Sequence, residues 1–317
     1  ESLAALARDW RRGLDGLTGS EAAALISANA RLRARHPLRA VLTGQGAALT
    51  EQLTALEQGQ PAPGILRGEA AERAGKTAFV FCGNGAQWAG MGLAFYEGDP
   101  AYRAGFDKVS KAFKPMLGRS LTKLMRDEDL GEELDHGLVG QPLLLALQIA
   151  LVEALAAKGL RPDAVAGHSV GEVAAAWTAG CLNLKDACRL IHARASAMEA
   201  LRGEGGMAAV LAGAETAETA LAEMGLTGLD VAGDNSPRSS TVSGPAEAVA
   251  AFVAEAKARR LAARQIPVTY PYHGPALERV RTPLLAGLVG LKPKAGSLPF
   301  FSATTGGLVA GTSLDAA

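Results

Sequence analysis

The residues Ala164-Val-Ala-Gly167-His168-Ser169-Val170-Gly171-Glu172 decide the fold of this chain. A short apolar segment leads into a serine flanked by glycines, and a run of alanines with helical character follows. Glycines beside a serine allow the tight strand-to-helix turn that projects its hydroxyl from the end of a sheet. The free N–H groups at the start of the helix, and the positive end of its dipole, favour an oxyanion at the same place. The stretch therefore predicts an α/β fold with Ser169 as a nucleophile, in preference to an ordinary glycine-rich turn.

Strands and helices alternate on both sides of this turn. A buried strand is predicted at Thr77 to Phe81, a helix at Pro142 to Lys158 with proline in its first turn, and a helix at about 184–201 capped by Asn183. A further strand is predicted at Pro299 to Ala303. This alternation is typical of a parallel sheet covered by helices, and we expect a large subdomain like that of the α/β-hydrolases.

Residues 205–265 follow a different order, which predicts a small ferredoxin-like subdomain. The expected order is strand, helix, strand, strand and helix, at 208–211, about 214–223, 228–232, 240–243 and about 245–258. The large α/β subdomain is then expected to comprise residues 76–204 and 266–317.

Residues 1–75 are expected to form a separate α+β domain. The predicted elements are helices at about 1–16, 20–34 and 47–58, with Ser20 as an N-cap, and a strand at Leu38 to Thr43. Proline, glycine and charged residues cluster between Gln60 and Lys76 and mark a boundary. Because Glu1 falls inside a helix-like pattern, we expect the chain to be a piece of a longer polypeptide.

The composition excludes several classes of function. The 317 residues are 48% hydrophobic and 20% charged, as in a globular protein with a sizeable core, and 32 basic side chains balance 32 acidic ones. A neutral chain without a basic block argues against nucleic acid or an anionic membrane as the main partner. The longest apolar stretch, Pro142 to Ala157, contains Gln148 and Glu153. It is too short and too polar to span a bilayer, and we expect a buried helix.

The three cysteines, Cys82, Cys181 and Cys188, have an odd count and no zinc-binding spacing. They predict neither a disulfide framework nor a metal site, and they favour a reducing, cytoplasmic location. Cys82 could act as a nucleophile, but the apolar strand before it favours a small buried side chain instead. No bound cofactor is expected.

The loop Gly83-Asn84-Gly85 follows the first predicted strand of the large subdomain. Its backbone N–H groups would lie at the carboxyl edge of the sheet, which suits an oxyanion hole. The loop is neither a Walker loop nor a dinucleotide-binding fingerprint, because no Gly-Lys-Ser/Thr follows and the glycine spacing differs.

A serine nucleophile needs a base, and the chain has five histidines: His36, His136, His168, His192 and His273. His273 is the favoured base because it follows a predicted strand, Gln265 to Thr269, and precedes a helix, so that it can stand at a sheet end as Ser169 does. A histidine that only satisfies structural hydrogen bonds is the alternative. The spacing identifies no acid that would orient the imidazole, and a backbone carbonyl could do so.

Arg194 interrupts an apolar helix face formed by Ala187, Ile191, Met198 and Leu201. A buried guanidinium needs an anionic partner of matching geometry. One interpretation is an ion pair with an aspartate or glutamate of the protein, which this argument alone slightly favours. The other is the carboxylate of a substrate.

Several motifs together resemble the acyltransferase domain of modular type I polyketide synthases, a relative of malonyl-CoA:acyl carrier protein transacylases. Phe81-Cys-Gly-Asn-Gly-Ala-Gln-Trp-Ala-Gly-Met-Gly resembles the family's FPGQGAQWAGMG, Gly140-Gln141-Pro142 its QP element, and residues 167–172 its nucleophile motif GHSVGE. Arg194 stands 25 positions after the serine, where the family keeps its carboxylate-binding arginine.

The resemblance continues to the C-terminus and begins at about residue 20. Gly205-Gly-Met and the segment from Asn235 to Gly244 resemble further signatures, and Tyr270-Pro-Tyr-His273 stands at the family's specificity motif. Cys82 and Asn84 replace the usual Pro and Gln, although a backbone donor survives that change. The chain ends before the family's closing Asn-Leu-Arg-like segment, so the group that orients His273 can lie outside it.

This resemblance implies ping-pong transfer of an acyl group from acyl-CoA, through an acyl-serine, to the phosphopantetheine thiol of an acyl carrier protein. It implies catalytic roles for Ser169 and His273, and an oxyanion hole at the backbone of Asn84 and Val170. The substrate-binding residues it implies are Arg194, Gln141, His168, Asn235, Tyr270 and Tyr272. Residues 1–75 resemble the linker that joins a ketosynthase to this domain, so a ketosynthase in the same polypeptide is a second expected partner.

Two alternatives from other classes stay open: a serine thioesterase or hydrolase, and a catalytically silent docking module. For the acyl group, malonyl is preferred over methylmalonyl because Tyr272 is as bulky as the phenylalanine of the malonyl-selective motif. Val170 also resembles the malonyl class. Tyr270, however, matches the first residue of the methylmalonyl-selective motif, so a methylmalonyl or unusual extender unit is the alternative.

Overall fold

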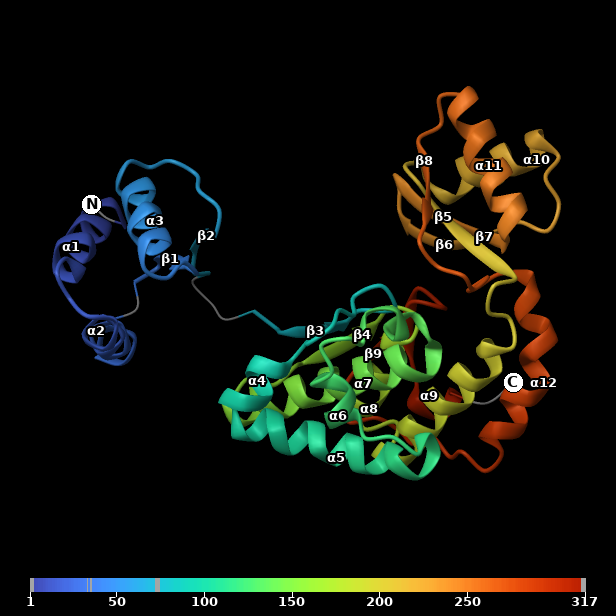
Figure 1. Cartoon of the computed structure of the whole chain (residues 1–317), viewed down its shortest axis with the longest axis horizontal. Helices are drawn as coiled ribbons and strands as arrows, with labels where there is room; N and C mark the ends of the chain where they lie inside the picture. The colour runs from blue at the N-terminus through green and yellow to red at the C-terminus, as the bar shows by residue number, and fades with distance from the viewer. Residues whose placement is uncertain (1–2, 33, 35, 72–74, 315–317) are drawn as a thin grey trace. The chain divides into compact units, whose positions relative to one another are not determined.

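A computed structural model describes residues 3–32, 34, 36–71 and 75–314. The chain divides into two compact units, Glu1–Gly75 and Lys76–Ala317, at the position of the proline- and charge-rich cluster (Figure 1). The predicted α/β fold is confirmed in the second unit, where parallel strands and helices form the main core.

The first unit consists of three helices and a two-stranded antiparallel sheet. Its elements are α1 (Leu3–Leu14), α2 (Gly19–Leu32), β1 (Leu38–Leu42), α3 (Ala47–Glu57) and β2 (Ile65–Glu69). A small core around Ala7, Leu53 and Leu56 joins α1 to α3. The sequence did not predict β2, because its residues lie in the stretch interpreted as a boundary.

The start of α2 differs from the prediction. Thr18, and not Ser20, caps the helix: the Thr18 hydroxyl accepts from the Glu21 N–H, and the Glu21 carboxylate accepts from the Thr18 N–H at 2.9 Å. This reciprocal pair is a capping box, and it places the helix start one residue before the expected cap.

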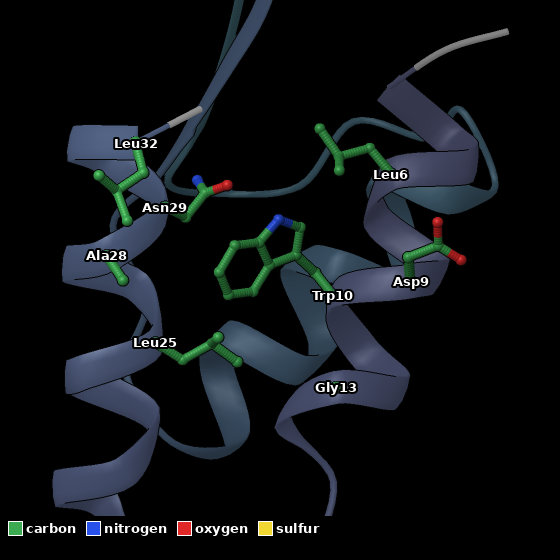
Figure 2. Close-up of a pocket in the computed structure, with 8 residues that line it drawn as sticks. All are labelled: Leu6, Asp9, Trp10, Gly13, Leu25, Ala28, Asn29 and Leu32. Carbon is green, nitrogen blue, oxygen red and sulfur yellow. The ribbon is translucent and has the colours of Figure 1, made fainter. Parts of the chain in front are cut away.

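An open cleft of about 480 Å³ lies between α1 and α2. Figure 2 shows the indole of Trp10 projecting into it, opposite Leu25, Ala28 and Leu32 of α2. Leu25 and Ile26 are more than a third exposed. The apolar side chains of α2 are therefore only partly covered by the described residues of this unit.

The large sheet of the second unit has the order β10-β9-β4-β3. Strands β3 (Ala78–Phe81), β4 (Ala164–Gly167) and β9 (Phe300–Ser302) are parallel, whereas β10 (Gly307–Val309) pairs antiparallel with β9. The predicted parallel sheet is present in β3, β4 and β9, and an unpredicted antiparallel strand is added at this edge, because a tight turn at 303–306 returns the chain beside β9.

The large subdomain also contains seven helices among the described residues, of which α8 packs directly on this sheet. They are α4 (Leu93–Gly98), α5 (Pro100–Leu117), α6 (Leu121–Met125), α7 (Gly137–Ala157), α8 (Gly171–Thr178), α9 (Leu184–Glu199) and α12 (Glu278–Leu288), with short 3₁₀ turns at Gly131–Asp135, Pro275–Leu277 and Gly311–Ser313. Phe81, Val165 and Phe300 are buried in the core on one face of the sheet. On the other face Val80 is 75% exposed and Phe301 43%. Within the described residues, therefore, the sheet is covered on one side only.

Helix α7 runs through the main core and is longer than predicted. It has 21 residues and begins at Gly137, so that Pro142 lies inside it and not in its first turn. Among the described residues it is the one helix long and apolar enough to cross a membrane, yet 67% of its most apolar window is buried inside the protein. The sequence argument excluded a membrane span because of length, and length does not exclude it. It is the burial of α7 that identifies it as a core helix.

Residues 205–266 form the second sheet, whose strands are all antiparallel. Its elements are β5 (Gly205–Val210), α10 (Ala214–Met224), β6 (Asp230–Ser236), β7 (Ser239–Pro245), α11 (Ala246–Ala258) and β8 (Ala263–Ile266), with sheet order β6-β7-β5-β8. Val242 and Phe252 are buried between the sheet and the helices. The βαββαβ order and the central position of β5 and β7 are those of the ferredoxin-like fold.

The last strand of this sheet corrects a prediction. The strand expected at Gln265 to Thr269 is instead β8, which pairs with β5 from Ala263 to Ile266 and ends before Pro267. Proline has no N–H to donate to the ladder, so the strand stops there. Residues 267–274 form a loop that returns the chain to the large subdomain; we call this segment the return loop.

Candidate active site

Ser169 lies at the turn between β4 and α8. Its φ is +51°, a left-handed conformation that a non-glycine residue rarely adopts. Close packing around the turn imposes it: a Cβ on Gly167 would collide with the Glu172 N–H, and one on Gly171 would lie 2.6 Å from the Cys82 carbonyl oxygen. The two glycines let the turn sit directly against β3, which leaves the serine hydroxyl at the sheet's carboxyl end.

His273 reaches Ser169 from the return loop. The serine Oγ and the His273 Nε2 are 2.7 Å apart, a hydrogen-bond distance. His273 also has a positive φ, +57°. The sequence argument placed His273 at the end of a strand like the one before Ser169, and this is wrong, because no strand of the large sheet directly precedes it. The preceding strand, β8, belongs to the small sheet.

The His273 side chain is exposed at the surface, but its imidazole is partly removed from water and lies near Arg194 and His168. Removal of the ring from water lowers its pKa below the ordinary 6.5, and the positive charges of Arg194 and His168 lower it further. A lowered pKa keeps the imidazole neutral near pH 7, the form that can accept a proton from Ser169.

Two backbone N–H groups belong to the segments beside the Ser169 turn. Gly83 packs against the elbow so closely that a Cβ there would lie 2.8 Å from the His168 carbonyl oxygen and 3.4 Å from the Ser169 Cβ. Asn84 follows it, and Val170 precedes the first turn of α8. Within the described residues neither the Asn84 nor the Val170 N–H has a hydrogen-bond acceptor. Both are available to an oxyanion on a substrate.

Arg194, on α9, points at the nucleophile. Its Nη1 donates to the Gln141 Oε1 at 2.7 Å, its Nη2 lies 3.4 Å from the Ser169 Oγ, and its guanidinium carbon lies 5.8 Å from the centre of the Tyr272 ring. Burial lowers the pKa of the guanidinium. No aspartate or glutamate among the described residues lies within 4.0 Å of it. The structure therefore does not contain the intramolecular ion pair that the sequence argument slightly favoured.

Tyr270 and Tyr272 form a stack beside Arg194. Their ring centres are 5.0 Å apart, and both side chains are buried. The Tyr270 hydroxyl donates to a Glu199 carboxylate oxygen at 2.9 Å and accepts from the Gly137 N–H at 3.3 Å. Burial raises the pKa of Tyr272 to about 12, although the nearby Arg194 opposes that shift. Both tyrosines thus stay neutral near pH 7.

A cleft of about 290 Å³ adjoins this group. It is lined by the Asn84 loop, the start of α7 with Gln141, and the return loop with Tyr270 and Tyr272. The Gln141 Nε2 and the Asn84 Oδ1 are buried without a hydrogen-bond partner in the described residues. The cleft therefore adjoins the partner of Arg194, Gln141, although Ser169, His273 and Arg194 do not themselves line it.

Three other sequence-predicted residues have different outcomes. His168 is exposed and adjoins Gly83 and the imidazole of His273. Asn235 is exposed on β6, where its amide donates to the Thr241 hydroxyl, and the structure does not bring it to Ser169. Cys82 is exposed and not buried as expected, because β3 ends at Phe81 and the chain turns outward.

Sequence reasoning missed two polar residues that support the site. The Glu172 Oε1 accepts from the Ser302 hydroxyl at 2.8 Å and from the Ala303 N–H at 2.5 Å, which ties the start of α8 to the end of β9. Gln148 donates to the Cys82 carbonyl. The signal for Gln148 was its presence in an apolar helix, which was used only to argue against a membrane span.

A serine on a strand-to-helix elbow, hydrogen-bonded to a histidine and near backbone N–H groups without an acceptor in the described residues, is typical of α/β enzymes with a serine nucleophile. A family model described as the acyl transferase domain matches residues 78–317. The chain belongs to this family, and the family prediction made from the motifs is confirmed.

Similar proteins agree with this assignment. Polyketide synthase GfsE of Streptomyces halstedii is 39% identical over 293 residues, which cover 90% of this chain and 8% of the relative. Mycoketide-CoA synthase of Mycobacterium tuberculosis is 37% identical over 252 residues, 80% of this chain and 6% of the relative. The chain therefore spans less than a tenth of either protein.

Solved structures give the same family. The acyltransferase domain from module 8 of the salinomycin polyketide synthase has a TM-score of 0.85 and 35% identity, and the match covers 99% of this chain and 73% of that one. MCAT from Streptococcus pneumoniae has a TM-score of 0.67 and 30% identity over 74% of this chain and 77% of that one.

Proposed function

We propose that this chain transfers an α-carboxyacyl group, preferentially malonyl, from coenzyme A to the phosphopantetheine thiol of an acyl carrier protein during polyketide synthesis. The observation that carries the proposal is the Ser169–His273 pair with an arginine beside it that has no carboxylate partner among the described residues. Ser169 and His273 take the catalytic roles, and Arg194 binds the free carboxylate.

In the first half-reaction the Ser169 Oγ attacks the thioester carbonyl carbon as the His273 Nε2 accepts its proton. The carbonyl oxygen becomes an oxyanion, stabilised by the N–H groups of Asn84 and Val170 and by the start of α8. The carbon–sulfur bond then breaks, and the imidazolium returns its proton to the CoA sulfur. An acyl-serine ester remains.

In the second half-reaction the carrier thiol gives its proton to His273, and its sulfur attacks the acyl-serine carbonyl. The same N–H groups stabilise the second oxyanion. The serine Oγ leaves and regains its proton from His273, which completes the transfer of the acyl group to the carrier. Exclusion of water from the ester distinguishes this reaction from hydrolysis.

Arg194 and Tyr272 support the choice of malonyl. A guanidinium next to the nucleophile suits a carboxylate, to which it can donate two parallel hydrogen bonds. Gln141 holds one side of the guanidinium, and the Tyr272 ring fills the space on another. A bulky ring there leaves less room for an α-methyl branch, although one methyl group is worth only about 1–3 kcal/mol of discrimination.

The remaining expectations from the sequence extend this proposal. His168 and Tyr270 line the approach to the site, and Asn235 requires a movement of β6 to reach the substrate. Residues 1–75 form the linker to a preceding ketosynthase, residues 205–265 the small subdomain, and 76–204 with 266–317 the large one. The unpaired cysteines support a cytoplasmic location.

Intact-protein mass after incubation with malonyl-, methylmalonyl- and acetyl-CoA tests the proposal. We expect a malonyl adduct on Ser169, no adduct in Ser169→Ala, and transfer to a phosphopantetheinylated carrier protein. Labelling that persists in Ser169→Ala contradicts the nucleophile. Rapid loss of the adduct to water without a carrier would identify a hydrolase, and no adduct from any acyl-CoA a silent module. Preference for methylmalonyl would mean that Tyr272 does not limit the α-substituent.

A further inference from the structure

Gln148 is a buried amide in the middle of the apolar core helix α7. Its side chain is 5% exposed, and its neighbours Leu144, Leu145 and Ile149 are fully buried hydrophobic residues. A polar side chain costs free energy in such surroundings unless it has a partner. Gln148 has one: its Nε2 donates to the Cys82 carbonyl oxygen at 2.8 Å and lies 3.6 Å from the Cys82 Sγ.

Cys82 directly follows β3, so its carbonyl lies just beyond the hydrogen-bonded ladder of the sheet. The preceding carbonyl, that of Phe81, accepts from the His168 N–H at 2.8 Å. No backbone N–H of the described residues donates to the Cys82 carbonyl. This oxygen also lies against Gly171, where a Cβ would approach it to 2.6 Å. The carbonyl is therefore held between the Gln148 amide and the first residue of α8.

The same peptide unit leads directly into the loop Gly83-Asn84-Gly85, which we call the oxyanion loop. The Cys82 carbonyl belongs to the peptide bond with Gly83, and Gly83 touches the elbow at His168 and Ser169. Asn84 is the next residue, and its N–H has no acceptor in the described residues and is one of the two proposed oxyanion donors. Rotation of the Cys82–Gly83 peptide toward another partner would therefore change the position of the Asn84 N–H relative to the Ser169 Oγ.

We infer that Gln148 is a positioning residue for the oxyanion hole, acting through the Cys82 carbonyl on the Asn84 N–H; this rests on the proposed function. Donors that face an oxyanion act mainly in the transition state, so an error in their position lowers the rate of the chemical step more than it changes substrate binding. The effect does not depend on the acyl group.

Gln141 provides the contrast on the same helix. It precedes Gln148 by two helical turns and accepts from Arg194, so α7 carries one amide for the carboxylate-binding group and one for the oxyanion loop. Loss of Gln148 should slow acylation by malonyl and acetyl groups equally. Loss of Gln141 should affect malonyl more.

The test is a measurement of Ser169 acylation by rapid-quench mass spectrometry, over a range of malonyl-CoA and acetyl-CoA concentrations. Gln148→Met keeps the side-chain length without a donor, and Gln148→Asn keeps the amide but withdraws it by one methylene, a milder change if the first variant folds poorly. We expect the maximal rate to fall about 10–10²-fold for both substrates, somewhat less than removal of an oxyanion donor costs. The half-saturating concentration should change by less than about threefold if binding is spared.

Ile149→Val is the matched control, since it makes a small cavity at the fully buried residue that follows Gln148 in the chain. It should lower thermal stability and leave the maximal rate unchanged. An alkyl fluorophosphonate tests the same oxyanion hole without acyl-CoA. The Ser169 Oγ bonds to phosphorus, fluoride leaves, and the hydroxyl proton passes to His273. The phosphoryl oxygen then occupies the position of the oxyanion. Its labelling rate should fall in both Gln148 variants.

The outcomes separate this inference from the proposed function. Folded Gln148 variants with unchanged rates overturn the inference, as does a loss confined to malonyl or carried by the half-saturating concentration. An equal loss in Ile149→Val also overturns it, because packing alone would then explain the effect. If acyl-CoA fails to label the unaltered protein but the fluorophosphonate does, the proposed function is wrong, and the fluorophosphonate rates alone decide the role of Gln148.

Discussion

The elbow at Ser169 and the return loop at His273 hold their reactive residues in the same unusual backbone conformation, with φ of +51° and +57°. They reach it by different means. At the elbow, Gly167 and Gly171 allow backbone to pack against backbone within a few residues of the serine. In the return loop, the constraint comes from side chains of distant segments: Tyr270 hydrogen-bonds to Glu199, and Pro271 packs against Gly205.

This difference shows which half of the Ser169–His273 pair depends on local sequence. The elbow needs only its own residues and the strand beside it. The return loop depends on the small sheet for its starting point and on α9 for its anchor. Changes far from His273 should therefore disturb the base while leaving the nucleophile in place.

The largest expected effect is the loss of the base itself. His273→Ala should slow acylation of Ser169 by roughly 10²–10⁴-fold, because no positioned group then accepts the hydroxyl proton. Single-turnover mass measurements check it, with His192→Ala, on α9, as a control that should retain the rate. Greater damage from His168→Ala, with the fold unchanged, would show that the base has been misassigned.

A substitution in the small sheet should disturb the return loop alone. A Cβ on Gly205 would lie 2.7 Å from the Cδ of Pro271, so Gly205→Ala must shift the loop that carries His273. A displacement of about 1 Å can cost around 10²-fold in rate. We expect a loss of up to this size in acylation, with thermal unfolding of the large subdomain little changed.

Gly206→Ala is the control for this variant. Its Cβ would meet atoms no closer than 3.9 Å, and neither glycine has a positive φ. It should retain activity. Equal rates in the two variants would mean that Pro271 does not fix His273, and the contrast between the elbow and the loop would fail.

The third prediction concerns selectivity. Arg194→Ala should weaken acylation by malonyl-CoA by about 1.5–3 kcal/mol, the range for a hydrogen bond to a charged group, or roughly 10–150-fold. Acetyl-CoA makes no such contact and should lose little. Competition between the two acyl-CoAs, read by mass, measures the ratio, and equal losses would assign Arg194 a structural role.

The smallest expected effect is a shift in pH dependence. Acylation needs neutral His273, whose pKa is lowered by removal from water and by Arg194 and His168. Because the neutral form persists below the ordinary pKa, the rate should fall only as pH drops through a midpoint below 6.5. Arg194→Ala removes one cause and should move that midpoint upward. A pH–rate profile with acetyl-CoA tests both, and a midpoint above 6.5 in the unaltered protein would contradict the lowered pKa of His273.

The sequence also predicted most helices and strands. Its errors fall where pairing between distant strands decides which residues form the strand. Asn183 caps α9 as expected, with its side chain accepting from the Asp186 N–H at 2.9 Å. The strand before His273 was misplaced because Gln265 to Thr269 has strand-like composition, whereas pairing with β5 selects Ala263–Ile266. Composition describes a segment's preference, and only the neighbouring strand fixes its register.

By itself, the sequence determined the elbow, the family and the candidate residues, because glycine spacing and strand–helix alternation are local properties of the chain. Only the tertiary structure decided that Arg194 has no carboxylate partner among the described residues, that Cys82 is exposed, and that Gln148 donates to the Cys82 carbonyl. Each of these facts depends on groups separated by tens of residues or more, and their contacts arise only when the core packs. A buried polar side chain signals that it has a partner, but the fold alone selects which one.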